Sequence, residues 1–421
     1  MSASESTPLL RDANGNGQPG HRLSWSERVV KVIKAEGEPS WLQSYRWFIF
    51  GSWVNILLLF VPLSAVAHHL NWDAALRFSF SFIAIVPLAK LLGDATENMS
   101  ASLGETMAGL LNASFGNAVE IIVGIAALLQ GQIRIVQTSM LGSILSNILL
   151  VLGCSFLAAG TVRAESVFQV TAAQASSSLM TLACITLVIP AAYNSTISKI
   201  TAPTGDDGAA ERGLLLISRG TAIMLLFVYA AFLWFQLKSH AFLYQRNDEE
   251  AGSINSQETP VPEEPEEEPN MNLPSAGVAL LVVTIITSFC ADYLVASIEE
   301  TAERYHIPKA FIGLILLPIV ANAAEHVTSV WMAMKNKMEL TITICVGSSI
   351  QIAAFVVPLM VIIGWITGHE LTLYFADFET ICLFVSVILV NTLIQDGKSN
   401  YMEGLLLVTL YAVIALAFWV S

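Results

Sequence analysis

The chain has 421 residues, of which 54% are hydrophobic and only 13% carry a charge, and its formal net charge is −14. A soluble domain carries about 25% charged residues, so this composition is typical of a membrane protein. The acidic balance argues against nucleic acid as a partner, because nucleic acid binds to basic surfaces.

Apolar runs begin after a polar N-terminal tail at 1–44, which lacks the pattern of a cleaved signal peptide. A membrane-spanning helix needs about 20 mostly apolar residues. By that criterion we expect eleven spans, at 45–67, 75–98, 104–130, 135–160, 166–192, 213–237, 272–302, 309–334, 339–367, 371–393 and 402–420. The predicted fold class is therefore an all-α polytopic membrane protein surrounded by lipid.

The distribution of charge predicts the orientation of the chain. Six basic residues precede or begin the first span, the last of them Arg46, so we place the N-terminus in the cytosol. Eleven spans then put the loop 238–271 in the cytosol as well. Between Asn247 and Met271 this loop has nine Asp or Glu residues and no Lys or Arg. It is either a solubilising linker or a segment that attracts or senses cations.

Two motifs recur at a fixed distance along the chain. Asn117 and Glu120 lie in FGNAVEII, and Asn322 and Glu325 follow in ANAAEHV with an offset of 205 residues. The segments GSILSN and GSSIQI keep this offset, which aligns Ser143 with Ser348 and Ser146 with Gln351. A two-part match that stays in register over about 30 residues indicates an internal duplication.

The span count predicts how the two copies are related. The glutamates lie in the third and eighth spans, and an odd separation means that these helices run in opposite directions. We therefore expect two inverted five-helix repeats, at 75–237 and 272–421, with 45–67 as an extra helix. This architecture is typical of secondary transporters, whose site lies near the middle of the membrane between the repeats.

The repeated residues predict a cation site. Asn and Glu three positions apart share one helix face, so two such helices offer two carboxylates and two amide oxygens. Ca²⁺ prefers about six to eight oxygen ligands. Pro318 cannot donate a backbone hydrogen bond, so it frees a carbonyl near Leu314 as a further ligand.

The same two carboxylates predict exchange. Two like charges in a low-dielectric site resist joint ionisation, so the pair can carry protons in one state and a divalent cation in the other. His326 follows Glu325 and is a candidate proton relay. Interhelical hydrogen bonding is the alternative role for the two asparagines. Helix packing is the alternative role for His326, Ser143, Ser146, Ser348 and Gln351. Candidates for cytosolic cation uptake or sensing are Glu97, Glu299, Glu263, Glu264, Glu266, Glu267 and Glu268.

The segments GLLNASFGNAVEII, GLILLPIVANAAEHV, KNKM and GSSIQIA resemble the paired motifs of the cation/proton exchangers (CAX) of the Ca²⁺/cation antiporter superfamily, especially fungal vacuolar Ca²⁺/H⁺ exchangers. The resemblance covers about residues 40–420. It implies a proton-driven Ca²⁺ antiporter of the vacuolar membrane that works by alternating access, needs no cofactor and is not an enzyme. The residues it implies for the exchange site are Glu120, Glu325, Asn117, Asn322, Ser348, Gln351 and His326.

Other transport classes fit the sequence less well. A Na⁺/Ca²⁺ exchanger would be expected to carry more hydroxyl groups around the acids, whereas Ala118, Ala323 and Ala324 are apolar. A channel often builds its pore from a ring of subunits, whereas this chain has its own two-fold pattern. The sequence lacks the HExxH motif of a metalloenzyme, and its five cysteines form no CxxC pair. The choice between Ca²⁺ and Mn²⁺, the stoichiometry and the oligomeric state stay open.

Overall fold

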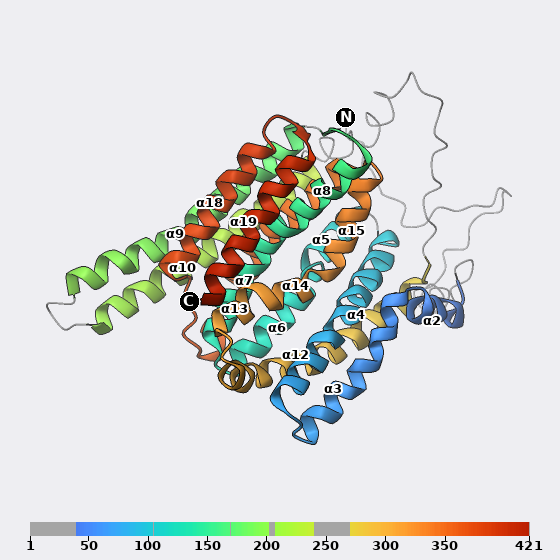
Figure 1. Cartoon of the computed structure of the whole chain (residues 1–421), viewed down its shortest axis with the longest axis horizontal. Coiled ribbons are helices and arrows are strands. Elements are labelled where there is room, and N and C mark those ends of the chain that lie inside the picture. Colours follow the sequence, from blue (N-terminus) through green and yellow to red (C-terminus); the bar gives the residue numbers. More distant parts are fainter. Residues whose placement is uncertain (1–38, 104, 169, 202–206, 240–269, 421) are drawn as a thin grey trace, which may run out of the picture.

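The computed structural model describes residues 39–103, 105–168, 170–201, 207–239 and 270–420. These residues form a helical bundle with one small sheet (Figure 1). The first group of helices is α2 (Trp41–Phe50), η1 (Trp53–Leu59), α3 (Phe60–His69), α4 (Ala74–Ala101), α5 (Glu105–Phe115), α6 (Ala118–Leu129), α7 (Ile133–Leu145), η2 (Ser146–Val151), α8 (Leu152–Val162), α9 (Val170–Thr201), α10 (Asp207–Trp234) and η3 (Phe235–Ser239).

The second group of helices follows residue 270 and repeats much of this pattern. It consists of α12 (Leu273–Tyr305), α13 (Lys309–Phe311), η4 (Ile312–Leu316), α14 (Leu317–Ala321), α15 (Ala323–Met334), α16 (Met338–Gln351), η5 (Ile352–Val356), α17 (Val357–Thr367), α18 (Asp377–Leu393) and α19 (Tyr401–Val420). The strands β1 (Ser166–Val167) and β2 (Lys398–Ser399) pair antiparallel, with Ser166 opposite Ser399.

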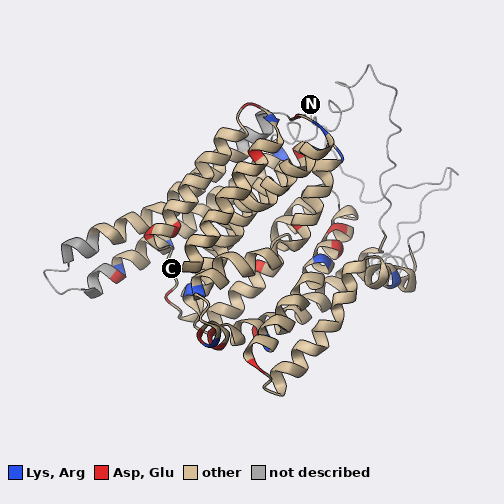
Figure 2. Ribbon diagram, in the orientation of Figure 1, with Lys and Arg blue, Asp and Glu red and all other residues tan. Residues whose placement is uncertain are grey.

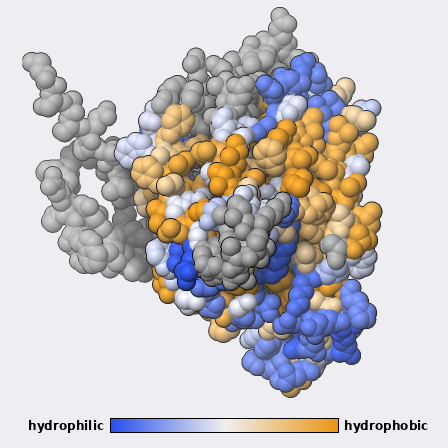
Figure 3. Space-filling model, turned by 90° about the vertical axis from the view of Figure 1, so that its left-hand side faces the viewer, coloured by the Kyte–Doolittle hydropathy of each residue, from blue (hydrophilic) through white to orange (hydrophobic). Residues whose placement is uncertain are grey.

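The bundle has the composition and surface of a membrane protein. Seven helices in the described ranges are long and apolar enough to cross a membrane, and ten spans result if each of three bent helix pairs counts as one. Figure 2 shows most charged residues near the ends of the helices, and Figure 3 shows an apolar band between hydrophilic ends. The all-α membrane fold is thus confirmed. The count of eleven stays a prediction, because α18, within the predicted span 371–393, has only 17 residues.

The first predicted span, 45–67, is not one straight helix. The axis of α2 is bent by 85° from that of Trp53–His69. Ser52 between them has extended backbone, and its side chain accepts a hydrogen bond from the backbone of Val54. The amide of Asn55 donates to the carbonyls of Phe48 and Ile49, both at 2.9 Å, and so satisfies groups at the end of α2.

The long helices α4 and α12 pack side by side in opposite directions (Figure 1). Near the end of α4, Asn98 accepts a hydrogen bond of 3.1 Å from the backbone of Met271, just before α12. At the other end, the hydroxyl of Tyr305 lies 3.2 Å from Asp73, just before α4. We call the first end the N-terminal face, because α2 contacts the start of α12 there, and the second end the opposite face.

The offset of 205 residues reappears in the bounds of the helices. It relates α6 to α15 and α8 to α17 at both ends of each helix. Asn117 and Asn322 stand at the starts of α6 and α15, where the chain bends by 42° and 58°. Wide helical turns, η2 and η5, begin within the last residues of the GSILSN and GSSIQI segments and are related by nearly the same offset. The duplication seen in the motifs therefore extends to local structure.

The central core lies along α7, η2 and α8, which form the most buried of the long apolar helices in the described chain. Its side chains are mainly Ile, Leu, Val and small polar residues, and they contact helices of both halves. Burial on all sides explains why this segment is apolar all round rather than on one stripe. The site described next lies against this core.

Candidate functional site

A cavity of about 970 Å³ extends from the middle of the bundle to the N-terminal face. Glu120 and Glu325 line its inner part. Glu97 and Ser100, near the end of α4, line its outer part together with Glu339, near the start of α16. The two predicted site carboxylates therefore lie together at the inner end of one cavity.

Each of these carboxylates occupies the first turn of a helix. Glu120 belongs to α6, which begins after Asn117, and Glu325 belongs to α15, which begins after Asn322. The N-terminal end of a helix has a partial positive charge and free backbone N–H groups, which stabilise a carboxylate there. The side chain of Glu120 is buried, and it lies near enough to Glu325 for the two charges to interact.

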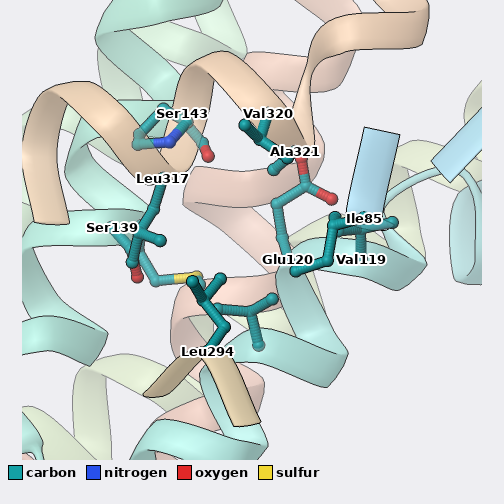
Figure 4. A pocket seen from close by; sticks show the side chains of 12 residues that line it. Ile85, Val119, Glu120, Ser139, Ser143, Leu294, Leu317, Val320 and Ala321 are labelled. Atoms are coloured by element: carbon teal, nitrogen blue, oxygen red, sulfur yellow. The ribbon is translucent and has the colours of Figure 1, made fainter. Parts of the chain in front are cut away.

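A small pocket surrounds the inner side of Glu120 (Figure 4). The carboxylate of Glu120 points toward the turn that contains Ala321, and Ser139 and Ser143 of α7 lie across the pocket. The amide nitrogen of Asn322 donates to the backbone carbonyl of Ser143 at 3.3 Å. The second asparagine motif thus contacts the helix that follows the first glutamate motif.

A directed chain of hydrogen bonds connects the two halves beside the carboxylates. Asn147 Nδ2 donates to Ser348 Oγ at 2.9 Å, and Ser348 Oγ donates to Asn117 Oδ1 at 3.0 Å. Asn117 Nδ2 in turn donates to Gln351 Oε1 at 2.5 Å. This chain fixes the orientation of the Asn117 amide. The side chains of Ser348 and Asn147 also lie close to the carboxylate of Glu325.

Several oxygen atoms at the site remain without a partner in the described chain. These buried acceptors are Glu325 Oε2, Asn322 Oδ1 and Asn147 Oδ1. A buried acceptor without a hydrogen bond is unfavourable, whereas the same atom is well suited to a hard cation. The described residues contain no group of three or more His, Cys, Asp or Glu that could hold a metal. A cation here would therefore rely on two carboxylates together with amide, hydroxyl or water oxygens.

Two predicted contributors lie outside the cavity. His326 is not among the described residues that line it, and its Nδ1 lies 3.2 Å from the carbonyl of Asn322 in the preceding turn. The carbonyl of Leu314 was expected to be free near Pro318, but it packs against Gly142 of α7. It is therefore enclosed between helices, which corrects its predicted role as a cation ligand.

The structure also corrects the grouping of residues expected to take up cations from the cytosol. Glu97 lines the cavity near the N-terminal face, but Glu299 lies near the end of α12 at the opposite face. Because α4 and α12 are antiparallel, the two glutamates cannot serve one side of the membrane. The predicted residues Glu263, Glu264, Glu266, Glu267 and Glu268 lie outside the described residues.

Sequence reasoning missed two features of the site. Asn147, which is fully buried, lacks a polar counterpart because the offset pairs it with Ile352. Its place at the end of GSILSN was the one available signal. Lys90 and Asp94 of α4 form an ion pair in the cavity wall, and Lys90 is the only basic side chain among the described lining residues. The spacing of four residues indicated that pairing.

Comparisons with known proteins agree with this architecture. The family profile described as "Sodium/calcium exchanger protein" matches residues 73–238 and 275–420. The chain is 44% identical over 372 residues to a vacuolar calcium ion transporter of Schizosaccharomyces pombe, with 88% of this chain and 85% of that protein covered. It is 42% identical over 365 residues to a Ca²⁺/H⁺ antiporter of Aphanothece halophytica, with 86% and 95% covered.

Solved structures show the same fold. The structure of native YfkE has a TM-score of 0.71 and 32% sequence identity, and the match covers 87% of this chain and 100% of that one. The structure described as H⁺/Ca²⁺ exchanger CAX has a TM-score of 0.61 at 13% identity, which supports the fold alone. Since the family profile matches most of the sequence and the relatives cover most of both lengths, the chain belongs to the sodium/calcium exchanger protein family.

Proposed function

We propose that this protein is a secondary antiporter that exchanges Ca²⁺ for H⁺ and needs no cofactor. The observation that carries the proposal is the pair of carboxylates, Glu120 and Glu325, at two helix starts related by one offset, at the inner end of a cavity. The names of the relatives from Schizosaccharomyces pombe and Aphanothece halophytica support Ca²⁺ and H⁺ as substrates.

The proposed binding step uses oxygen atoms that the geometry makes available. Ca²⁺ enters through the cavity and binds the two carboxylates, with Asn322 Oδ1 as a further ligand because it has no hydrogen-bond partner in the described chain. The network through Ser348 and Gln351 orients Asn117 for the same site. Ser143 contributes through its place in the pocket beside Glu120. His326 has a positioning role at most, since its ring nitrogen faces the preceding turn.

Exchange follows from the charge of the site. Two protons or one divalent cation neutralise the two carboxylates equally, whereas the empty ionised pair is expensive to move through a low-dielectric core. The loaded forms are therefore the ones that change access. Protonation from the acidic side releases Ca²⁺ there, and deprotonation on the other side restores the site.

Alternating access is supported by the repeat. We infer eleven spans, in which the halves 75–237 and 272–421 are inverted copies and 45–67 is an additional helix. Each half contributes one glutamate, so a rearrangement of one half against the other exposes the site to one side at a time. In the structure the cavity lies on the N-terminal face, which corresponds to one of the two access states.

We place the N-terminus and the acidic segment 238–271 in the cytosol and the protein in the vacuolar membrane. The basic residues before the first span support this orientation. The names of relatives from Schizosaccharomyces pombe and Oryza sativa support the vacuolar location. The cavity then faces the cytosol, so the structure corresponds to the state that takes up Ca²⁺ for transport into an acidic lumen.

Na⁺/Ca²⁺ exchange and wider divalent exchange, including Mn²⁺, are the alternatives within the same family. The residues next to the carboxylates, Ala118, Ala323 and Ala324, supply no hydroxyl ligands for additional Na⁺ sites. Uptake driven by a Na⁺ gradient at equal pH on both sides would favour the first alternative. Competition by Mn²⁺ for Ca²⁺ uptake would establish the second.

The test is Ca²⁺ uptake into proteoliposomes that have an acidic interior. Glu120→Gln and Glu325→Gln keep the shape of each side chain but remove its charge, so we expect each to reduce uptake to the level of empty liposomes. Glu370→Gln, at an exposed glutamate of the opposite face, is the control and should transport like the wild type. Wild-type uptake by either site variant would overturn the assignment.

A further inference from the structure

A polar contact bridges two parts of the bundle at the opposite face. Glu299 of α12 accepts a hydrogen bond of 3.3 Å from Gln132, which lies in the turn between α6 and α7. Its other oxygen accepts a hydrogen bond of 2.5 Å from Lys309 at the start of α13. Glu299 thus holds α12 against the turn that follows the first glutamate helix.

The turn that contains Gln132 has a counterpart in the second half of the chain. Gln132 and Lys337 precede α7 and α16, with φ, ψ of −83°, 57° and −99°, 57°. The residue before each is left-handed, with φ of 71° at Gly131 and 66° at Asn336. Both pairs follow the offset of 205 residues. The two turns are therefore equivalent in backbone conformation and in position within their halves.

The partner of that turn also has a counterpart. The offset relates Glu299 of α12 to Asp94 of α4, both carboxylates, and relates Thr301 to Thr96, both buried. By the same offset, the contact between Glu299 and Gln132 at the opposite face would have its counterpart in a contact between Asp94 and Lys337 at the N-terminal face. These two residues carry opposite charges.

That second contact is absent from the described structure, where the cavity is open. Asp94 pairs instead with Lys90, one helical turn earlier in α4, and both line the cavity wall. No ion pair of Lys337 is present among the described residues, and its side chain is exposed beside the mouth of the cavity. Asp94 therefore pairs with Lys90 while the cavity is open. Lys337 is available as a second partner, on the turn that would approach Asp94 if this face closed.

We propose that Asp94 is a further positioning residue of the exchange cycle, with two alternative partners. It pairs with Lys90 while the N-terminal face is open and with Lys337 when that face closes. At the same time, the contact of Glu299 with Gln132 opens at the opposite face. This inference rests on the alternating access of the proposed function and adds the residues that hold each face shut.

Cross-linking in proteoliposomes tests the proposal directly. The full-length chain with Asp94→Cys and Lys337→Cys reports closure of the N-terminal face, and Gln132→Cys with Glu299→Cys reports closure of the other. The five natural cysteines are buried or half-buried, so they compete little for the oxidant. Imposing a Ca²⁺ and pH gradient should speed the 94–337 cross-link and slow the 132–299 cross-link. The proposal is overturned if the 94–337 cross-link does not form, or if both respond in the same direction.

A kinetic measurement provides a second test that does not depend on cross-linking. Lys337→Met should lower the maximal exchange rate by about fivefold, because an exposed ion pair contributes up to about 1 kcal/mol, and should leave the KM for Ca²⁺ unchanged. Lys337→Arg should keep the wild-type rate. Lys335→Met is the matched control, since Lys335 lies on the same turn over the ring of Trp331. Equal effects of Lys335→Met and Lys337→Met would overturn the role of Lys337.

The same vesicles distinguish this inference from the proposed function. The Asp94 switch alone is overturned if the wild type shows normal proton-driven Ca²⁺ uptake but the two cysteine pairs do not respond in opposite directions. Absence of proton-driven uptake overturns the proposed function. In that case the opposite responses of the two cross-links to an imposed Na⁺ gradient still decide the inference.

Discussion

Ser348 is the residue through which the two halves share one hydrogen-bond chain at the site. It accepts from Asn147 and donates to Asn117. In Ser348→Ala, Asn147 loses its acceptor and Asn117 is free to rotate its amide away from the cation. Loss of one partner in a buried pair costs about 1–3 kcal/mol, so we expect the KM for Ca²⁺ to rise by roughly tenfold. Initial rates of Ca²⁺ uptake over a range of concentrations measure this.

The neighbouring serine is a matched control for that prediction. Ser349 is also fully buried, but its hydroxyl donates to the backbone carbonyl of Cys345 at 2.9 Å, and it is not among the described residues that line the cavity. Ser349→Ala should therefore leave the KM unchanged. A similar rise in KM for both variants would show that general packing, rather than the hydrogen-bond chain, determines Ca²⁺ binding.

At the same scale, the residues of the candidate site that are easiest to predict from the sequence are those that occur in both halves. Glu120 and Glu325 could be recognised because a charge in an apolar run is unfavourable and because each repeats the other at a fixed offset. Asn147 could not, since its counterpart is Ile352 and its partner Ser348 is far away in the chain. Contacts between distant helices depend on packing geometry, which no local pattern contains.

At the scale of elements, α7 crosses the η4–α14 segment at a glycine. A Cβ at Gly142 would overlap the carbonyl of Leu314 and the ring of Pro318, whereas a Cβ at its counterpart Gly347 would meet nothing within 4 Å. Gly142→Ala should therefore destabilise the protein by about 1–3 kcal/mol through overpacking. Gly347→Ala should be neutral or stabilising by up to about 1 kcal/mol, because alanine favours a helix more than glycine does.

Thermal unfolding of the purified protein in detergent measures both changes. We expect the unfolding temperature of Gly142→Ala to lie below that of the wild type, and that of Gly347→Ala to be equal or higher. Because the two glycines occupy equivalent positions, the comparison separates the crossing from general effects of alanine. A loss of stability in Gly347→Ala equal to that in Gly142→Ala would contradict the close approach at Leu314.

The same scale shows what hydropathy can predict. Apolar runs of about 20 residues predict that a helix is present, and the long helices α4, α12 and α19 lie where such runs were expected. Hydropathy averages over a window and does not register direction, so the 85° bend after α2 and the breaks at Asn117 and Asn322 could not be foreseen. The bends depend on a few side chains that satisfy backbone groups, such as Asn55.

At the scale of the whole molecule, two equivalent halves adopt an asymmetric arrangement. The N-terminal face contains the cavity, while contacts such as Glu299 with Gln132 and Arg304 with Asp73 join helices at the opposite face. The proposed alternating access requires the two halves to differ in conformation, because exchanging their conformations exchanges the open side. The structure thus predicts which surface can be reached by a soluble reagent.

Thr328→Cys tests this accessibility. Thr328 lies one helical turn after Glu325, is exposed, and lines the cavity. A membrane-impermeant thiol reagent should label the cysteine from the N-terminal face and block Ca²⁺ uptake, and Ca²⁺ bound at Glu325 should slow the labelling. Thr367→Cys, at the exposed end of α17, is the control and should react only from the opposite face. Labelling of Thr328→Cys mainly from the opposite face would show that the cavity opens to the other side and that the assigned orientation of the transport cycle is wrong.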